Sequence, residues 1–99
     1  MYNNNLYELI PINSKQASFY KKAFYTIVNN EATLYSYTSN VCQVDKDRGA
    51  YYLNWNIKEN LLFSNTTLKH IKEFLKQQLG VDIKSKKELI EKEGLSLWS

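Results

Sequence analysis

The sequence is poor in cysteine, glycine, proline and arginine, and these shortages exclude several classes of protein. One cysteine, Cys42, cannot form an intrachain disulfide, which excludes a disulfide-stabilised scaffold and fits a reducing compartment. One histidine, His70, together with Cys42 falls short of the usual zinc ligand sets, so we expect no metal site and no cofactor. Arg48 is the one arginine among 13 basic residues, and this argues against sequence-specific recognition of DNA bases.

Long hydrophobic runs are also missing. No apolar stretch approaches the length that a membrane-spanning helix needs. The first residues, MYNNNLYELIPI, carry neither the basic region nor the apolar region of a signal peptide. We therefore expect a cytoplasmic protein without membrane association.

The chain does have enough apolar side chains for one core. It has 99 residues, 43% of them hydrophobic and 14% aromatic, with eight Tyr, four Phe and two Trp. A chain of this length allows a single domain over residues 1–99. The net charge of +3 is spread along the chain rather than concentrated in one block.

The clearest local pattern is an amphipathic helix between Ser64 and Gly80. Ser64, Asn65 and Thr66 are all suitable N-cap residues, and Gly80 stands where a left-handed residue usually ends a helix. At about 100° per residue, a narrow apolar stripe forms along this helix. It consists of Leu68, Ile71, Leu75 and Leu79, with Phe74 at its margin.

Strand-forming segments precede this helix, and a second helix follows it. Short extended segments are expected over residues 6–12, 19–28, 32–38, 41–44 and 50–55, with turns at 29–30 and 45–49 and a bulge at 39–40. Residues 56–63 show no clear element, although Leu61, Leu62 and Phe63 must pack somewhere. Ser85 and Glu88 form a capping box for a short helix ending near Gly94, and we expect the apolar tail Leu95, Leu97 and Trp98 to dock.

These elements predict an α+β domain. Its small antiparallel sheet has three to four strands and is covered on one face by one long helix, with a short C-terminal helix after it. The other face of the sheet would then be open unless the second helix or a second copy of the chain covers it.

Two groups of side chains are candidates for binding a partner. Exposed aromatic residues on the open face would mark an interaction site, and the candidates are Phe19 or Tyr20, Tyr35, Tyr37, and Tyr51 or Tyr52. Lys21 and Lys22 stand between aromatic pairs, which is typical of single-strand binders. Lys69, Lys72 and Lys76 form a basic stripe that fits a phosphate backbone, or whose stems cover the margin of the core.

Catalytic chemistry has little support. His70 is expected on the face of the long helix away from the core, with Glu73 and Gln77, as a solvated or partner-contacting side chain. A Cys42–His70 couple would need the fold to bring the two together. Thr66 and Thr67 are explained by helix capping as well as by anion binding. We therefore expect a protein that is not an enzyme.

Several stretches carry a resemblance that covers residues 6–89. They are SFYKKA (18–23), LYSYTSNV (34–41), FSNTTLKHIKEFLKQ (63–77) and SKKEL (85–89). Together they resemble a family of small uncharacterised proteins from phages and mobile elements of low-GC Gram-positive bacteria. Ser39, where this family is expected to have Thr, and the long connection over 56–62 depart from its pattern.

The resemblance implies a setting in a bacterial host cell and a class of function. Short phage proteins of this kind include host-takeover and counter-defence binders, among them anti-CRISPR inhibitors. The first hypothesis is thus an inhibitor that blocks a type II CRISPR effector nuclease, or its guide or target channel. The alternative is a small nucleic-acid-binding accessory or regulatory protein, whose affinity would fall steeply with salt.

Overall fold

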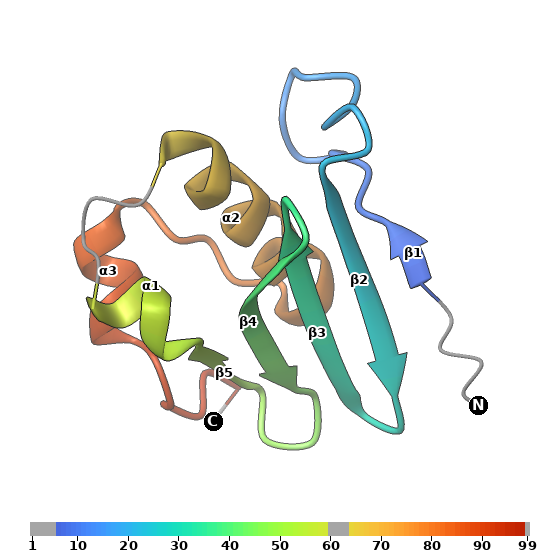
Figure 1. Cartoon of the computed structure of the whole chain (residues 1–99). Coiled ribbons are helices and arrows are strands. Elements are labelled where there is room, and N and C mark those ends of the chain that lie inside the picture. The colour runs from blue at the N-terminus through green and yellow to red at the C-terminus, as the bar shows by residue number, and fades with distance from the viewer. Residues whose placement is uncertain (1–5, 60–63, 99) are drawn as a thin grey trace.

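Five strands and three helices make up the fold, which is α+β as the sequence predicts (Figure 1). The computed structural model describes residues 6–59 and 64–98. The strands form one antiparallel sheet in chain order: β1 (Leu6–Glu8), β2 (Ala23–Val28), β3 (Glu31–Ser36), β4 (Ser39–Asp45) and β5 (Ala50–Leu53). The helices are α1 (Trp55–Glu59), α2 (Asn65–Leu79) and α3 (Lys86–Glu91). The sheet is thus larger than the three to four strands expected. Helix α1 begins at the end of the segment expected to be extended over 50–55 and continues into the stretch for which no element was predicted.

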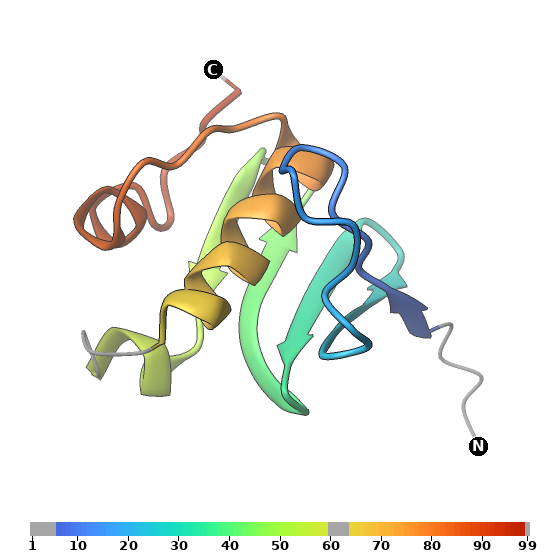
Figure 2. The same cartoon turned by 90° about the horizontal axis from the view of Figure 1, so that it is seen from above.

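The core lies between the sheet and α2, which crosses one face of the sheet (Figure 2). Alternate residues of each strand face the helix because successive side chains point to opposite sides. In the register, Leu34 lies opposite Cys42, and Val44 opposite Tyr51. These side chains are buried together with Ile71, Phe74 and Leu75 of α2, as the apolar stripe predicts.

Both longer helices begin at the caps that the sequence predicts. The Ser64 hydroxyl accepts the backbone N–H of Thr67 at 3.1 Å, and Gly80 ends α2 with a φ of +72°. The Ser85 hydroxyl accepts the backbone N–H of Glu88 at 3.1 Å. The Glu88 carboxylate accepts the backbone N–H of Lys84 instead of that of the cap residue, so the capping box is shifted by one position.

The C-terminal tail covers the free edge of β5, which confirms that it docks. The Leu97 N–H donates to the Gly49 carbonyl and the Gly94 N–H to the Tyr51 carbonyl, each at 2.8 Å. The Trp98 indole donates to the Leu79 carbonyl at 2.9 Å. Leu95 and Trp98 are each 53% exposed, so the tail is only partly covered.

The start of β2 and the position of the bulge differ from the sequence-based expectation. The strand expected over 19–28 begins only at Ala23, and the residues before it form a turn. The register pairs Leu34 with Cys42 and Tyr35 with Asn40, so the bulge has its extra residue at Val41 of β4, one position beyond the expected 39–40. The residues Leu61, Leu62 and Phe63, for which we expected a packed position, lie outside the described residues.

Candidate functional site: the open face of the sheet

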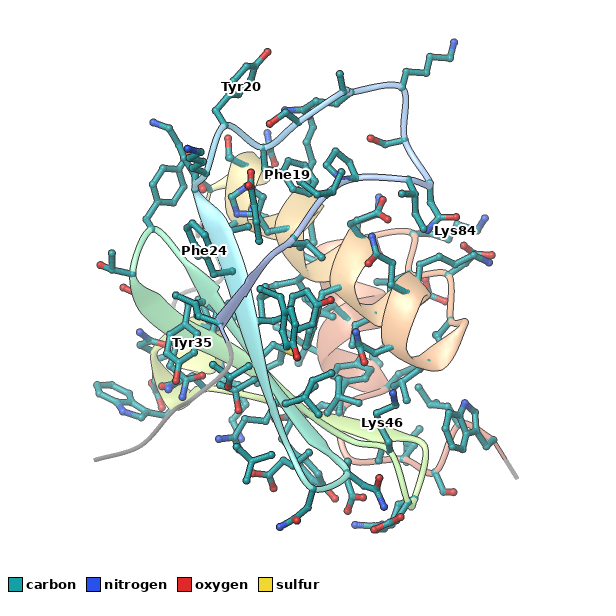
Figure 3. All side chains as sticks on the ribbon, turned by 90° about the vertical axis from the view of Figure 1, so that its right-hand side faces the viewer. Phe19, Tyr20, Phe24, Tyr35, Lys46 and Lys84 are labelled. Atoms are coloured by element: carbon teal, nitrogen blue, oxygen red, sulfur yellow. The ribbon has the colours of Figure 1, made fainter. Side chains whose placement is uncertain are left out.

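The face of the sheet that α2 leaves uncovered carries aromatic side chains near β1. The register places Phe24 opposite Tyr35, and Leu6 opposite Thr26, on this outer face. Figure 3 shows Phe24 and Tyr35 beside each other on the side of the sheet away from α2, with Tyr20 projecting above them. The antiparallel pairing therefore gathers side chains from three strands and one loop.

These side chains line a concavity of about 850 Å³. We call it the sheet-face concavity, and its lining residues in the described chain come from strands and turns and not from a helix. It is lined by Leu6, Tyr20, Lys21, Lys22, Phe24, Thr26, Tyr35, Tyr37 and Thr38. A concave surface with aromatic walls and a few polar groups is the usual form of a binding site.

The rim of the concavity is built from residues in an unfavourable backbone conformation. Tyr20, Lys21, Tyr37 and Thr38 have φ values of +55°, +59°, +52° and +72°. For a residue other than glycine this left-handed region costs about 1–2 kcal/mol. Such strain is found most often at functional sites, where the surrounding structure holds it in place. Of the five non-glycine residues with positive φ in the described chain, these four line the concavity.

The two strained turns are joined to each other. The Tyr37 N–H donates to the Lys22 carbonyl at 2.9 Å, so the turn before β2 is fixed to the hairpin between β3 and β4. The Tyr20 N–H donates to the Ser18 hydroxyl at 2.8 Å and fixes the same turn from its other side. Hydrogen bonds therefore join the two turns of the rim, which are not independent loops.

Exposed rings and lysine ammonium groups meet at this rim. Tyr20 is 73% exposed and Tyr37 48% exposed. The Lys22 ammonium lies 5.5 Å from the centre of the Tyr37 ring, within cation–π range. Within the described part of the chain, no carboxylate forms an ion pair with Lys21 or Lys22. The site can thus stack against a flat ring and attract an anionic group at the same place.

His70 supports the rim from below instead of facing solvent. It is 1% exposed, and its Nδ1 lies 2.8 Å from the Ser36 hydroxyl. Its ring packs against Phe19, with centroids 4.6 Å apart, and against Tyr37 at 5.8 Å. Burial lowers the pKa of His70, so the ring is neutral at pH 7. The prediction of an exposed His70 is wrong because the 9–19 segment covers this side of α2.

Glu73, also expected on the solvent face, is buried as well and holds that segment in place. Its carboxylate accepts the backbone N–H groups of Ile12 and Asn13, each at 3.1 Å. It also accepts the side-chain amides of Asn13 at 3.0 Å and Gln77 at 2.6 Å. Burial raises the pKa of Glu73, but the hydrogen bonds from Gln77, Ile12 and Asn13 outweigh it, so the pKa lies below the ordinary value.

The predicted partner-binding residues fall into three places. Tyr35, Tyr37, Lys21 and Lys22 lie together in the sheet-face concavity. Lys69, Lys72 and Lys76 line a separate pocket beside α2. Tyr51 is fully buried, with its hydroxyl donating to the Leu89 carbonyl. The prediction that Tyr51 lies on the open face is wrong. Tyr51 pairs with the buried Val44 of β4 and therefore faces the core, whereas the half-buried Tyr52 faces outward.

Four lining residues have no counterpart among the predicted site residues: Leu6, Phe24, Thr26 and Thr38. Phe24 and Leu6 reach the concavity through the β1–β2–β3 pairing. Alternation of side chains along the 19–28 segment could have indicated that Phe24 faces outward. Assigning Phe24 to the outer face also required knowing that the strand begins at Ala23. Of the pair left open, Tyr20 is the exposed member and Phe19 the buried one.

Cys42 and His70 are both enclosed by the core. Cys42 is fully buried, and desolvation raises the pKa of its thiol far above the ordinary value, with a smaller contribution from Glu93. Among residues 6–59 and 64–98 no cluster of three or more His, Cys, Asp or Glu could hold a metal ion. No helix in this part of the chain is long and apolar enough to cross a membrane.

Fold and site together define a small α+β domain with an open, aromatic sheet face. The chain belongs to DUF8033, a family of unknown function whose model matches residues 7–92. It has no significant match among curated proteins. It has none among solved structures either.

Proposed function

We propose that this protein is a non-enzymatic binding protein and that its sheet-face concavity binds single-stranded nucleic acid. The observation that carries the proposal is that one concavity on the uncovered sheet face gathers aromatic rings, two of them exposed, with two lysines that form no ion pair in the described chain. Proteins that bind single strands combine aromatic rings, on which bases stack, with basic groups that follow the backbone. Several RNA-binding domains present such rings on a sheet surface.

The arrangement suits stacking in particular. Phe24 and Tyr35 are opposite residues of an antiparallel pair, whose β-carbons lie about 4.5–5.5 Å apart. Tyr20 and Tyr37 extend the aromatic surface toward the rim, where Lys21 and Lys22 stand. The strained, mutually bonded turns hold these groups in position before any strand arrives, so little ordering entropy remains to be lost on binding.

Fluorescence anisotropy with labelled oligo-dT and oligo-U tests the proposal. Stacking contributes about 1–3 kcal/mol per base, so Tyr20→Ser should weaken binding by roughly tenfold or more. Trp55→Ser is the matched control, because Trp55 is 71% exposed on α1 and lies outside the concavity. Lys21→Gln with Lys22→Gln should flatten the salt dependence by a slope of up to about 1.4. Absence of binding at low salt, or equal loss in the Trp55 control, would refute the proposal.

A second candidate is a counter-defence inhibitor that binds a type II CRISPR effector in a bacterial host cell. Two of the stretches that resemble small phage proteins, residues 18–23 and 34–41, contribute to the rim of the concavity. Tyrosine-rich concave surfaces also suit protein partners. With a net charge of +3 the protein would block the effector or its channel rather than imitate DNA.

A cleavage assay separates the second candidate from the first. Purified effector nuclease, loaded with its guide, is mixed with an excess of wild-type protein or of the Tyr20→Ser variant. Inhibition by the wild type and weaker inhibition by the variant support the inhibitor. Full cleavage at large excess removes this role for the effector tested.

A further inference from the structure

A second pocket lies on the helix side of the molecule, between α2 and the loop of residues 13–19. Its volume is about 390 Å³, within the size range of small-molecule sites. Lys69, Lys72 and Lys76 line it from α2, and Lys15 lines it from the loop. We call it the lysine pocket.

Positive charge is in excess around this pocket. Among the described residues, the pocket is lined by four lysines and two carboxylates, Glu73 and Asp82, with a net charge of +2. Asp82 pairs with Lys76 at 3.3 Å. The Glu73 carboxylate is occupied by neutral N–H donors from Ile12, Asn13 and Gln77.

The remaining lysines lack an anionic partner. Throughout the described chain, no carboxylate forms an ion pair with Lys15, Lys69 or Lys72. Lysine stems beside a helix cover apolar surface with their methylene groups, and such packing leaves the ammonium groups free for a ligand. Lys72 and Lys76 are half-buried, so their positions are restricted before a ligand binds.

We propose that the lysine pocket binds a phosphate-bearing ligand of about nucleotide size. Compact ammonium groups bind phosphate well as point charges, and in the described chain three of the four lysines that line this pocket form no ion pair with a carboxylate. Buried Phe19 and Ile83 form apolar parts of the wall, against which the non-phosphate portion of the ligand can lie. This site is separate from the sheet-face concavity and does not depend on the function proposed for it.

The phosphate has two possible sources, a free phosphorylated molecule or a nucleic-acid strand. Phe19 lines the lysine pocket, while the next residue, Tyr20, lines the concavity, so one loop borders both sites. Pyrophosphate and ATP represent the free molecule, and oligo-dT represents the strand. Amide chemical shifts of residues 13–16 and 69–76 report binding at the pocket in either case.

The test compares wild type with two doubly substituted proteins of equal net charge. Lys69→Gln with Lys72→Gln removes two pocket lysines, and each loss should weaken phosphate binding by about tenfold. Lys46→Gln with Lys87→Gln is the control, because neither residue lines the pocket. Pyrophosphate or ATP binding that the pocket variant loses and the control keeps supports a free ligand.

The nucleic-acid source is supported if oligo-dT shifts the same amides in wild type but not in the pocket variant, and if pyrophosphate and ATP shift none of them. If none of the probes shifts these amides at millimolar concentration, the proposal is wrong. Equal weakening in the pocket variant and the control also overturns it, since only net charge would then matter. Loss of the Tyr20-dependent oligonucleotide affinity does not bear on this site, so the two proposals fail independently.

Discussion

Replacement of Glu73 by glutamine should detach the segment around Ile12 and Asn13 from α2. The carboxylate accepts four N–H groups, two from the backbone and two from side-chain amides. A glutamine keeps one oxygen and turns an NH₂ group toward donors, so about two of these bonds are lost. A buried donor without a partner costs about 1–3 kcal/mol.

We therefore expect Glu73→Gln to lower the free energy of unfolding by about 2–4 kcal/mol. In a domain of this size, the melting temperature would fall by about 10–20 °C. Glu91→Gln is the matched control, because this substitution makes the same chemical change at a residue that is exposed on α3. Thermal unfolding and amide hydrogen exchange at Ile12 and Asn13 measure the global and local effects.

The pH dependence tests the same reasoning. The pKa of Glu73 is lowered in the folded state, so the carboxylate contributes fully to the free energy of unfolding above the ordinary glutamate pKa of about 4.3. It is lost as the pH falls through the folded-state value, and the advantage of wild type over Glu73→Gln should shrink there. If Glu73→Gln matches the Glu91→Gln control in both melting temperature and amide protection, Glu73 does not hold this segment.

Three further predictions concern the core and the rim. Thr38→Gly should stabilise the protein by about 0.5–1 kcal/mol in denaturant unfolding, since relief of a left-handed β-branched residue outweighs the entropy of glycine; a loss of stability would contradict the strain argument. Burial lowers the pKa of His70, so the neutral ring contributes fully to the free energy of unfolding above about pH 6.5, and this contribution is lost as the pH falls below that value. An NMR titration in which His70 is protonated at or above about pH 6.5 would disprove this. Tyr51→Phe should cost about 1–2 kcal/mol in stability, because the Leu89 carbonyl loses its donor, and should leave oligonucleotide affinity unchanged; a weaker affinity would return Tyr51 to the binding face.

Helix α2 was predictable because its signals are local. The 3.6-residue spacing of its apolar side chains and the caps at Ser64 and Gly80 depend only on neighbouring residues. The same holds for the Asn29–Asn30 hairpin, since asparagine tolerates positive φ and Asn29 has a φ of +58°. Such features need no knowledge of distant contacts.

The surroundings of α2 were not predictable in the same way. A helical wheel divides residues between core and solvent, but His70 and Glu73 face a third environment, the segment of residues 9–19. That segment reaches α2 across about 60 residues of sequence, and the donors it offers to Glu73 are backbone groups. No side-chain pattern encodes such a contact.

The face of Tyr51 could not be assigned from the sequence for a related reason. Tyr51 and Tyr52 are adjacent, so one must face the core and the other must not, and composition cannot decide between them. The opposition of Tyr51 to Val44 decides it, and this pairing depends on the 45–49 turn. Tyr35, by contrast, does face outward as expected, opposite Phe24 of β2.

The motif formed by Thr66, Thr67, His70 and Glu73 in α2 has a structural position that bears on the site. Its members Thr67, His70 and Glu73 point away from solvent and contact the elements that form the rim. His70 packs against Phe19 and Tyr37, and Glu73 holds the segment that leads into the strained turn.

A strained rim persists only where its surroundings hold it, and α2 supplies that restraint from the opposite side of the sheet. The motif therefore helps to hold the rim in place, while the residues that we propose to contact nucleic acid are Tyr20, Lys21, Lys22 and the Phe24–Tyr35 pair of β2 and β3. On this argument, substitutions in the motif change affinity through the conformation of the rim, and substitutions at Tyr20 change it without altering the fold.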